Sequence, residues 1–304
     1  MAIGDVYEVD ACTDVYYLDT GMYATPEYGA VYVVDAERPA VVDTGIGTDY
    51  EFVLDALEAV GIAPGELAVI APTHVHLDHA GGAGYLAEAC PNADVYVHEI
   101  GAPHLVDPGR LIEGTKRAVG TQWEFYTEPI PVPEARIVEL TDGDVVDLGD
   151  RRLDVHHAPG HAPHQVVFFD PDDAAAYVAD AAGIWVPSRE VVRPTTPPPN
   201  FDFEQCLADL EMLRGLAPEV LLYAHYGPGG DDPDALLAEY ERVLTEWVAD
   251  IETQREALGD DDAVVAHFVE KEADLADLYG EQKATAETTM NVRGVLRYLK
   301  HRGG

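Results

Sequence analysis

The sequence predicts an α/β fold in which two mixed β-sheets pack face to face with helices outside. Three observations support this fold class. Over residues 1–230, short apolar runs rich in β-formers alternate with turn signals. Amphipathic helices are interspersed among these runs, as in layered α/β domains. After Gly230 the chain shows helical periodicity only. We therefore predict one domain over residues 1–230 and a helical C-terminal extension over residues 231–304.

The individual elements follow from apolar runs bounded by turn residues. In chain order, strands are expected at residues 15–18, 30–34, 40–42, 67–71, 94–97, 145–148, 153–156, 165–169, 174–179 and 219–224. Helices are expected at residues 49–60, 83–89, 203–216, 234–258, 261–278 and 282–301. In the first helix, apolar side chains such as Phe52 and Leu57 recur near one face. The run Asp260-Asp261-Asp262 supplies an N-cap.

The charge balance is extreme for a folded chain. Among 304 residues, 18 are basic and 57 acidic, which gives a net charge of −39. No segment is of low complexity, so the excess is spread over the folded surface. Such a surface repels itself at low salt, whereas at about 1 M salt the Debye length is only about 3 Å. We interpret the composition as halophilic adaptation to a high-salt cytoplasm. The three cysteines, Cys12, Cys90 and Cys206, contain no CxxC pair and are expected to be buried or inert thiols.

The segment 74–79, with the sequence HVHLDH, is the strongest functional signal. It places three imidazoles and one carboxylate directly after a predicted strand. A packed core does not need this composition, but imidazole and carboxylate are ligands that zinc and iron prefer. On an extended segment His74 and His76 point to the same side, Asp78 continues that alternation, and His79 follows. One short loop can thus present two groups of ligands, which suits two metals better than one.

Further candidate ligands stand where other predicted strands end. These are His157, His161, Asp180 and His225. Open sheets carry their sites at the carboxyl ends of their strands, so we expect these residues to approach the hexapeptide. The pair Gly81-Gly82 lets the chain turn closely beside the ligands.

With these motifs the sequence resembles the metallo-β-lactamase-fold hydrolases, in particular their glyoxalase-II-like and lactonase-like branch. The matching motifs, in the family's order, are VDTG at 42–45, THVHLDH at 73–79, APGH at 158–161, VAD at 178–180 and AHYG at 224–227. The resemblance spans about residues 40–228. It implies a four-layer αββα sandwich and makes residues 1–230 the catalytic domain.

The resemblance also implies a ligand set for two divalent metal ions, with Zn²⁺ preferred and Fe or Mn as alternatives. The first metal would be held by His74, His76 and His161, and the second by Asp78, His79 and His225. Asp180 would bridge both metals. A hydroxide shared between the metals would attack the substrate, which gives Asp78 and Asp180 catalytic roles. Asp43 and His157 would lie behind the ligands and fix their geometry.

The function expected from this resemblance is metal-dependent hydrolysis of a small thioester, ester or lactone. One alternative is an oxidoreductase of the same fold, a mono-iron persulfide dioxygenase. Another is a metallo-ribonuclease, although the chain lacks a basic groove, which makes nucleic acid an unlikely substrate. A non-catalytic binding protein would not need the full ligand set.

The N-terminal residues lack the features of a signal peptide, and no apolar run reaches membrane-spanning length. We therefore expect a cytoplasmic protein without membrane contact. The expected partner is a small-molecule substrate, and the C-terminal helices offer a surface for a homo-oligomer.

Two insertions are expected to border the site, at residues 99–133 and 187–200. Their aromatic residues, and Trp185 just before the second, are candidates for apolar contacts with a substrate, with ordinary packing as the alternative. His156 and His164 are expected to be surface or loop residues. The C-terminal helices are expected to form an appendage that packs on the core, with a substrate cap as the alternative.

Overall fold

The computed structural model describes residues 2–48 and 50–302. The predicted start of the first helix, Asp49, and the predicted end of the extension, 303–304, lie outside these ranges. Over the described residues, the strands form a seven-stranded sheet with the order β1-β2-β3-β4-β5-β6-β7. A six-stranded sheet has the order β15-β14-β11-β10-β9-β8, and a small ribbon pairs β12 with β13.

Both large sheets are mixed. The first contains β1 (Val6–Glu8), β2 (Val15–Asp19), β3 (Ala30–Val34), β4 (Ala40–Val42), β5 (Val69–Ala71), β6 (Asp94–His98) and β7 (Ile137–Leu140). The second contains β8 (Val145–Asp147), β9 (Arg152–His157), β10 (Val166–Asp170), β11 (Ala175–Tyr177), β14 (Val220–Tyr223) and β15 (Gly227–Pro228), while the ribbon consists of β12 (Ile184–Val186) and β13 (Val191–Arg193). Strands β4 to β7 pair in parallel, as do β11 and β14, and the other neighbours are antiparallel.

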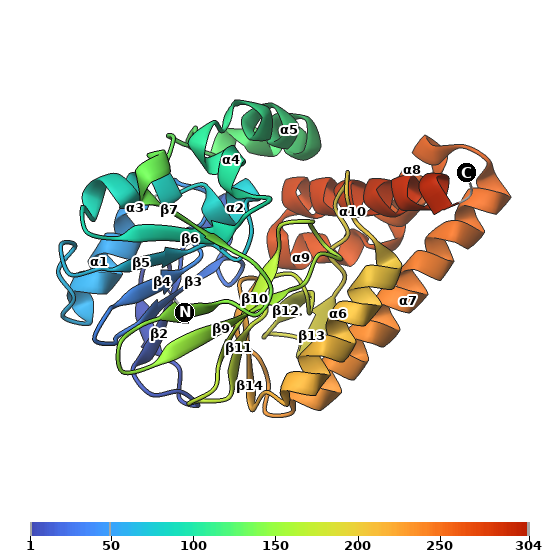
Figure 1. The fold of residues 1–304 in the computed structure, drawn as a ribbon. Helices are drawn as coiled ribbons and strands as arrows, with labels where there is room; N and C mark the ends of the chain where they lie inside the picture. The colour runs from blue at the N-terminus through green and yellow to red at the C-terminus, as the bar shows by residue number, and fades with distance from the viewer. Residues whose placement is uncertain (1, 49, 303–304) are drawn as a thin grey trace.

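Helices cover the outer face of each sheet, so the molecule has four layers (Figure 1). Helices α1 (Glu51–Ala59) and α3 (Ala83–Ala89) pack on the first sheet through a cluster that includes Leu57, Ile70 and Leu86. A second cluster, which includes Tyr32 and Phe168, fills the space between the sheets. Helices α6 (Phe203–Leu216) and α7 (Pro233–Leu258) cover the second sheet. The predicted αββα sandwich is therefore confirmed.

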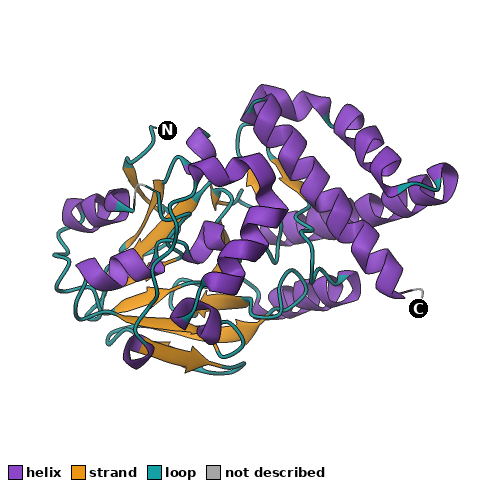
Figure 2. Ribbon diagram, turned by 90° about the horizontal axis from the view of Figure 1, so that it is seen from above, coloured by secondary structure: helices purple, strands orange, loops and turns teal. Residues whose placement is uncertain are grey.

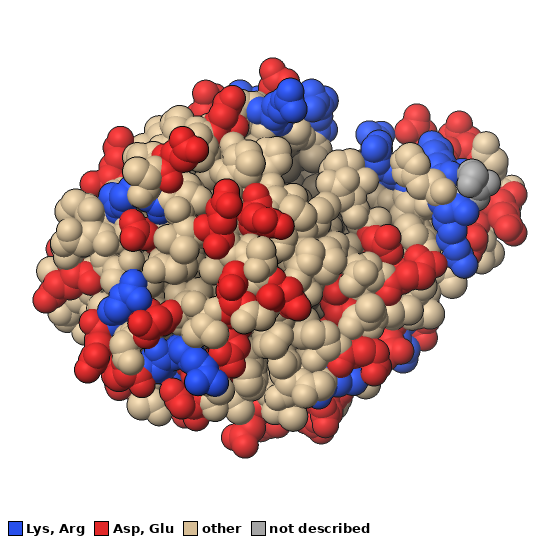
Figure 3. All heavy atoms as spheres, viewed as in Figure 1, with Lys and Arg blue, Asp and Glu red and all other residues tan. Residues whose placement is uncertain are grey.

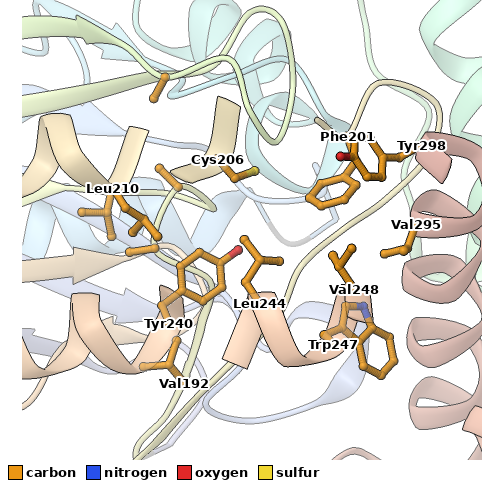
Figure 4. Close-up of a cluster of buried hydrophobic side chains, with 14 of the residues drawn as sticks. Val192, Phe201, Cys206, Leu210, Tyr240, Leu244, Trp247, Val248, Val295 and Tyr298 are labelled. Atoms are coloured by element: carbon orange, nitrogen blue, oxygen red, sulfur yellow. The ribbon is translucent and has the colours of Figure 1, made fainter. Parts of the chain in front are cut away.

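The C-terminal helices share a core with the second sheet. After α7 come α8 (Asp261–Lys271), α9 (Ala276–Tyr279) and α10 (Glu281–Arg302), and Figure 2 shows these helices gathered at one end of the molecule. In Figure 4, Tyr240 and Trp247 of α7 lie in one apolar cluster with Leu210 of α6 and Val295 of α10. This cluster continues across residue 230, where we placed a domain boundary, and the boundary itself stays a prediction.

Aspartates begin three of these helices. The side chains of Asp202, Asp232 and Asp260 accept hydrogen bonds from backbone N–H groups three residues further on. Each such cap stabilises a helix by about 1 kcal/mol. The cap predicted at Asp260 is thus confirmed, but the single helix predicted over 261–278 is wrong. A 3-10 turn at Ala273–Leu275 separates α8 from α9, and it brings Leu275 into the core with an exposed fraction of 1%.

The predicted burial of the thiols is confirmed, because Cys12, Cys90 and Cys206 are all buried and free. Burial raises the pKa of the Cys90 thiol to about 11 and that of Cys206 well above its usual value. These thiols are therefore protonated and weakly reactive near neutral pH. No helix in the described part of the chain combines the length and apolar character needed to cross a bilayer.

Candidate metal centre

The hexapeptide forms the junction between β5 and a one-turn helix, α2 (Leu77–Ala80). His74 precedes this turn, and His76 is the extended residue at its N-terminus. Asp78 and His79 belong to the helical turn itself. The predicted extended alternation therefore holds from His74 to His76 and is wrong at Asp78, because the chain has already begun to coil there. The helical turn places Asp78 and His79 in a second ligand group.

The predicted role of Gly81 and Gly82 is explained by close backbone approach. A Cβ on Gly82 would lie 2.5 Å from the carbonyl oxygen of Thr44, and one on Gly81 would lie 2.4 Å from that of Leu77. Gly82 N–H also donates to Thr44 Oγ1 at 3.1 Å. Glycine at these positions lets the ligand turn pack directly on the loop that carries Asp43.

The first ligand group has the dimensions of a metal site. His76 Nδ1 lies 2.9 Å from His74 Nε2 and 3.1 Å from His161 Nε2. Asp180 Oδ2 lies 3.5 Å from His74 Nε2 and 3.4 Å from His161 Nε2. A tetrahedral zinc site with bonds of about 2.1 Å has ligand-to-ligand edges of about 3.4 Å. The four distances given, from 2.9 to 3.5 Å, are therefore close to the edges of such a shell.

The second ligand group lies on the other side of Asp180. Asp78 Oδ2 is 4.0 Å from His79 Nε2 and 3.7 Å from His225 Nε2. Asp180 reaches this group with both oxygens, Oδ2 at 3.1 Å from His79 Nε2 and Oδ1 at 3.9 Å from His225 Nε2. Asp180 is thus the side chain common to both groups, in the position predicted for a bridging carboxylate.

Two buried atoms in this cluster test whether a cation fits. His79 Nε2 and Asp180 Oδ1 are both buried and make no hydrogen bond of good geometry within the described protein, although His79 Nε2 lies 3.1 Å from Asp180 Oδ2. A buried polar atom without a partner costs about 1–3 kcal/mol. A cation between the two groups would satisfy both atoms, and the donor set of imidazole and carboxylate is one that zinc and iron accept. The residues present therefore fit the two-metal centre predicted from the sequence.

Backbone and side-chain contacts behind the cluster fix the orientation of two ligands. Asp43 accepts from the backbone N–H of Thr73 at 2.8 Å, and its other oxygen lies 2.9 Å from His79 Nδ1. His225 Nδ1 lies 2.9 Å from the carbonyl oxygen of Tyr28. Both contacts engage one ring nitrogen and leave Nε2 directed at the cluster, which is the usual way that proteins orient histidine ligands.

The loop of His161 is anchored by α6. The backbone N–H of Gly160 donates to Asp209 Oδ2 at 2.7 Å, and Gln205 Nε2 donates to Asp209 Oδ1 at 2.9 Å. A Cβ on Gly160 would lie 2.4 Å from the backbone nitrogen of Cys206. Gly160 in the APGH motif is therefore explained by the close packing of the ligand loop against this helix.

Two further histidines, His157 and His164, flank the loop of His161. His157, predicted to support the ligands, has its Nε2 2.8 Å from the carbonyl oxygen of Pro163, and its ring stacks on His98 at 4.2 Å. It thus contacts the ligand loop and a second imidazole. His164, predicted to be a surface or loop residue, lies in a turn and is buried, with its ring 5.5 Å from that of His76. No sequence signal separates the two, since both flank the same motif.

A cavity of about 240 Å³ opens beside the cluster, with His76, Asp78, His161, Asp180 and His225 on its floor. Both predicted insertions line it: the first through α5 (Gly109–Val119) and Tyr126, and the second through residues 195 and 197–200. Helix α10 lines it too, through Glu287, Met290 and Asn291. The C-terminal helices therefore pack on the core, as expected, and one of them, α10, also completes the cavity wall.

Of the other aromatic candidates, Trp185 belongs to the core beside α6 and α7. Trp123 stacks on Tyr126 at 5.2 Å, and Phe125 packs on a cluster with Tyr23. Ordinary packing explains these three side chains, and Tyr126 is the candidate that reaches the cavity.

The protonation states of the cluster predict pH-dependent metal loading. Burial lowers the pKa of His76 to about 4, and burial with neighbouring imidazoles holds that of His74 well below its usual value. Although burial opposes it, the carboxylates of Asp43, Asp180 and Asp78 hold the pKa of His79 well above its usual value. At neutral pH the metal-free protein therefore carries a proton on His79 that a metal must displace.

We expect metal affinity to rise by up to about tenfold per pH unit from neutral pH upward, until His79 is deprotonated, with one proton released for the second metal. Titration calorimetry in buffers of different ionisation enthalpy measures this proton directly. An affinity that does not depend on pH would show that His79 is already neutral and would contradict the prediction.

Comparison with known proteins bears on this geometry. The family model of the metallo-beta-lactamase superfamily matches residues 24–225. The metallo-beta-lactamase fold-containing protein ST1585 of Sulfurisphaera tokodaii is 27% identical over 224 residues, which cover 71% of this chain and 79% of that protein. The acyl-coenzyme A thioesterase MBLAC2 of Homo sapiens is 27% identical over 187 residues, or 55% of this chain and 62% of the thioesterase. The latter match thus spans less than two thirds of the thioesterase.

Solved structures show the same fold. The crystal structure of ST1585 from Sulfolobus tokodaii superposes with a TM-score of 0.68 at 23% identity, covering 94% of this chain and 99% of that one. A metallo-beta-lactamase family protein from Thermus thermophilus superposes with a TM-score of 0.66 at 22% identity, covering 95% and 94% of the two chains. The family model covers more than half of the sequence and spans all seven predicted ligands, and the chain belongs to the metallo-beta-lactamase superfamily.

Proposed function

We propose that this protein is a dinuclear metal-dependent hydrolase that acts on a small thioester, ester or lactone. The observation that carries the proposal is the position of Asp180 between two groups of imidazole and carboxylate donors on the floor of a cavity. The similarity to an acyl-coenzyme A thioesterase supports a thioester among these substrates.

Two divalent ions held by the seven ligands would supply a nucleophilic water near neutral pH and would polarise the carbonyl of the substrate. The chain itself sets the geometry for this chemistry. Asp43 and the carbonyl of Tyr28 orient His79 and His225 from behind. Asp78 is the carboxylate most open to the cavity, with a side-chain exposure of 27% against 3% for Asp180. It is therefore the ligand best placed to accept a proton during the reaction.

A donor group stands on the cavity wall. The hydroxyls of Tyr23 and Tyr126 contact each other, and both residues line the cavity. One hydroxyl donates its hydrogen bond to the other, and the second hydroxyl can then donate to an oxygen of the substrate. Such a donor would help to hold the carbonyl in place beside the metals.

Elemental analysis of protein purified in high KCl without added metal tests this proposal first. We expect close to two zinc ions per chain, followed by hydrolysis within a panel of thioesters and lactones. About one iron per chain would favour the oxidoreductase alternative, which oxygen uptake with persulfides would then test. Failure to bind metal, even after reconstitution, would contradict both functions.

A further inference from the structure

The cavity has one polar wall and one apolar wall. The predicted ligands form the polar wall, while Leu111, Ala118 and Val119 of α5, a helix that contacts α2, form the apolar wall. Helix α10 adds Met290 next to α5. Among the described residues, no lysine or arginine lines the cavity. An anionic group against the α5 side of the cavity, away from the candidate metal ligands, would have no lysine or arginine as a partner, so the apolar wall is suited to an uncharged, apolar group.

A glycine interrupts the apolar wall in the middle of α5. The lining residues of α5, at positions 111, 114, 115, 118 and 119, fall within about 140° of its circumference. A Cβ on Gly114 would meet no atom within 4 Å. The helix does not need glycine there, because the φ of Gly114 is not positive and glycine destabilises a helix interior. The absent side chain leaves space on the cavity side of the helix.

We propose that Gly114 is a specificity-determining residue and that the space before it receives the apolar, uncharged acyl chain of the substrate. This inference rests on the proposed function, because the position of the acyl chain follows from a reacting carbonyl bound at the metals. A carbonyl placed over Asp78 and Asp180 would lie in the same cavity as Leu111 and Gly114, so its acyl substituent could pack against that wall. Burying each methylene of that chain against this wall favours binding several-fold.

The polar leaving group is expected to remain outside. Three exposed basic residues, Arg110, Lys116 and Arg117, lie on α5, in a chain with only 18 basic residues in total. Figure 3 shows basic surface over α5 beside a hollow between this helix and the C-terminal helices. A polar or anionic thiol carrier at this rim would meet cations that the cavity interior does not provide.

Gly114→Val tests the inference by filling the space, and Gly215→Val is a matched control. Gly215 lies in α6, is exposed, and a Cβ there also meets no atom within 4 Å. The substrates are acetyl, butyryl, hexanoyl and octanoyl thioesters of one thiol, N-acetylcysteamine. In Gly114→Val we expect kcat/KM for the octanoyl thioester to fall by at least about tenfold, with the acetyl thioester changed by less than about twofold. Gly215→Val should match the wild type for every chain length.

The possible failures are distinguishable. If Gly114→Val lowered kcat/KM equally for all chain lengths, or for none, the proposed role of Gly114 would be overturned. The proposed hydrolase function would still stand. If the metal-loaded wild type hydrolysed no thioester, the proposed function would fail, and binding of octanamide by calorimetry would decide the inference without turnover. We expect the wild type and Gly215→Val to bind octanamide more tightly than acetamide, and Gly114→Val to lose this preference. Equal binding of both amides by the wild type would also refute the inference that this space receives an acyl chain.

Discussion

Asp180→Asn is expected to lower kcat/KM by more than about 100-fold and to remove at least one metal. Changing a residue that only supports a metal ligand already costs about 10–100-fold, and Asp180 touches both ligand groups itself. The asparagine amide keeps the size of the side chain but withdraws the negative charge. His74, His79 and His161, which now face that charge, would then face a neutral group.

Metal content and turnover are measured on the same preparation. Asp154→Asn is the control, because Asp154 forms a surface ion pair with Arg152 at 2.8 Å, and such pairs contribute about 0–1 kcal/mol. The control should keep its metal and its activity. Two bound metals and near-normal turnover in Asp180→Asn would rule out the bridging role.

Lys283→Met is expected to destabilise the fold by about 3–5 kcal/mol, which is the cost of leaving a buried charge without its partner. Lys283 Nζ lies 2.7 Å from both Glu287 Oε2 and Tyr28 Oη, and all three residues are buried. The Lys283 ammonium also lies over the rings of Tyr28 and Tyr23 at 4.1 and 4.6 Å. Removing it leaves the Glu287 carboxylate buried with the Tyr28 hydroxyl as its remaining donor.

Urea unfolding at constant high KCl measures the effect. Lys271→Met is the matched control, since Lys271 pairs with Asp250 at 2.8 Å with both side chains about half exposed, and should cost less than about 1 kcal/mol. Adding Glu287→Gln to Lys283→Met should recover stability, because it removes the unpaired charge. If the two lysine variants lost the same free energy of unfolding, burial would not strengthen the ion pair of Lys283 with Glu287.

The sequence predicted strands best where both faces of a strand are buried. The bounds expected at 30–34 and 40–42 agree with β3 and β4, because burial on both faces produces a continuous apolar run. Strand β1 was missed, since it is short, lies at the sheet edge and is only partly buried. The ribbon of β12 and β13 was also missed, because part of it lies within the proline-rich insertion, which gives no alternating pattern.

The parts of the candidate site that depend on residue type, such as the metal-ligand side chains, could be predicted from the sequence. The structure brings all seven predicted ligands together, and Asp43 lies behind His79 as expected. Contacts that a ligand makes with a backbone group could not be predicted, because every residue type carries such a group. The carbonyl of Tyr28 holds His225 across 197 positions, and any residue type at 28 has such a carbonyl. The participation of Glu287 and Met290 in the cavity could not be predicted either, because it depends on how α10 folds back toward the candidate metal ligands.

This return of α10 to the cavity has a consequence for biogenesis. A ribosome synthesises the chain from its N-terminus, so the last metal ligand, His225, emerges before residues 281–302, which form α10. All seven candidate ligands are therefore synthesised before α10, whereas the cavity has its full set of walls only after α10 has packed next to α5. The last step in assembling the cavity is thus the docking of a segment that carries none of the candidate metal ligands.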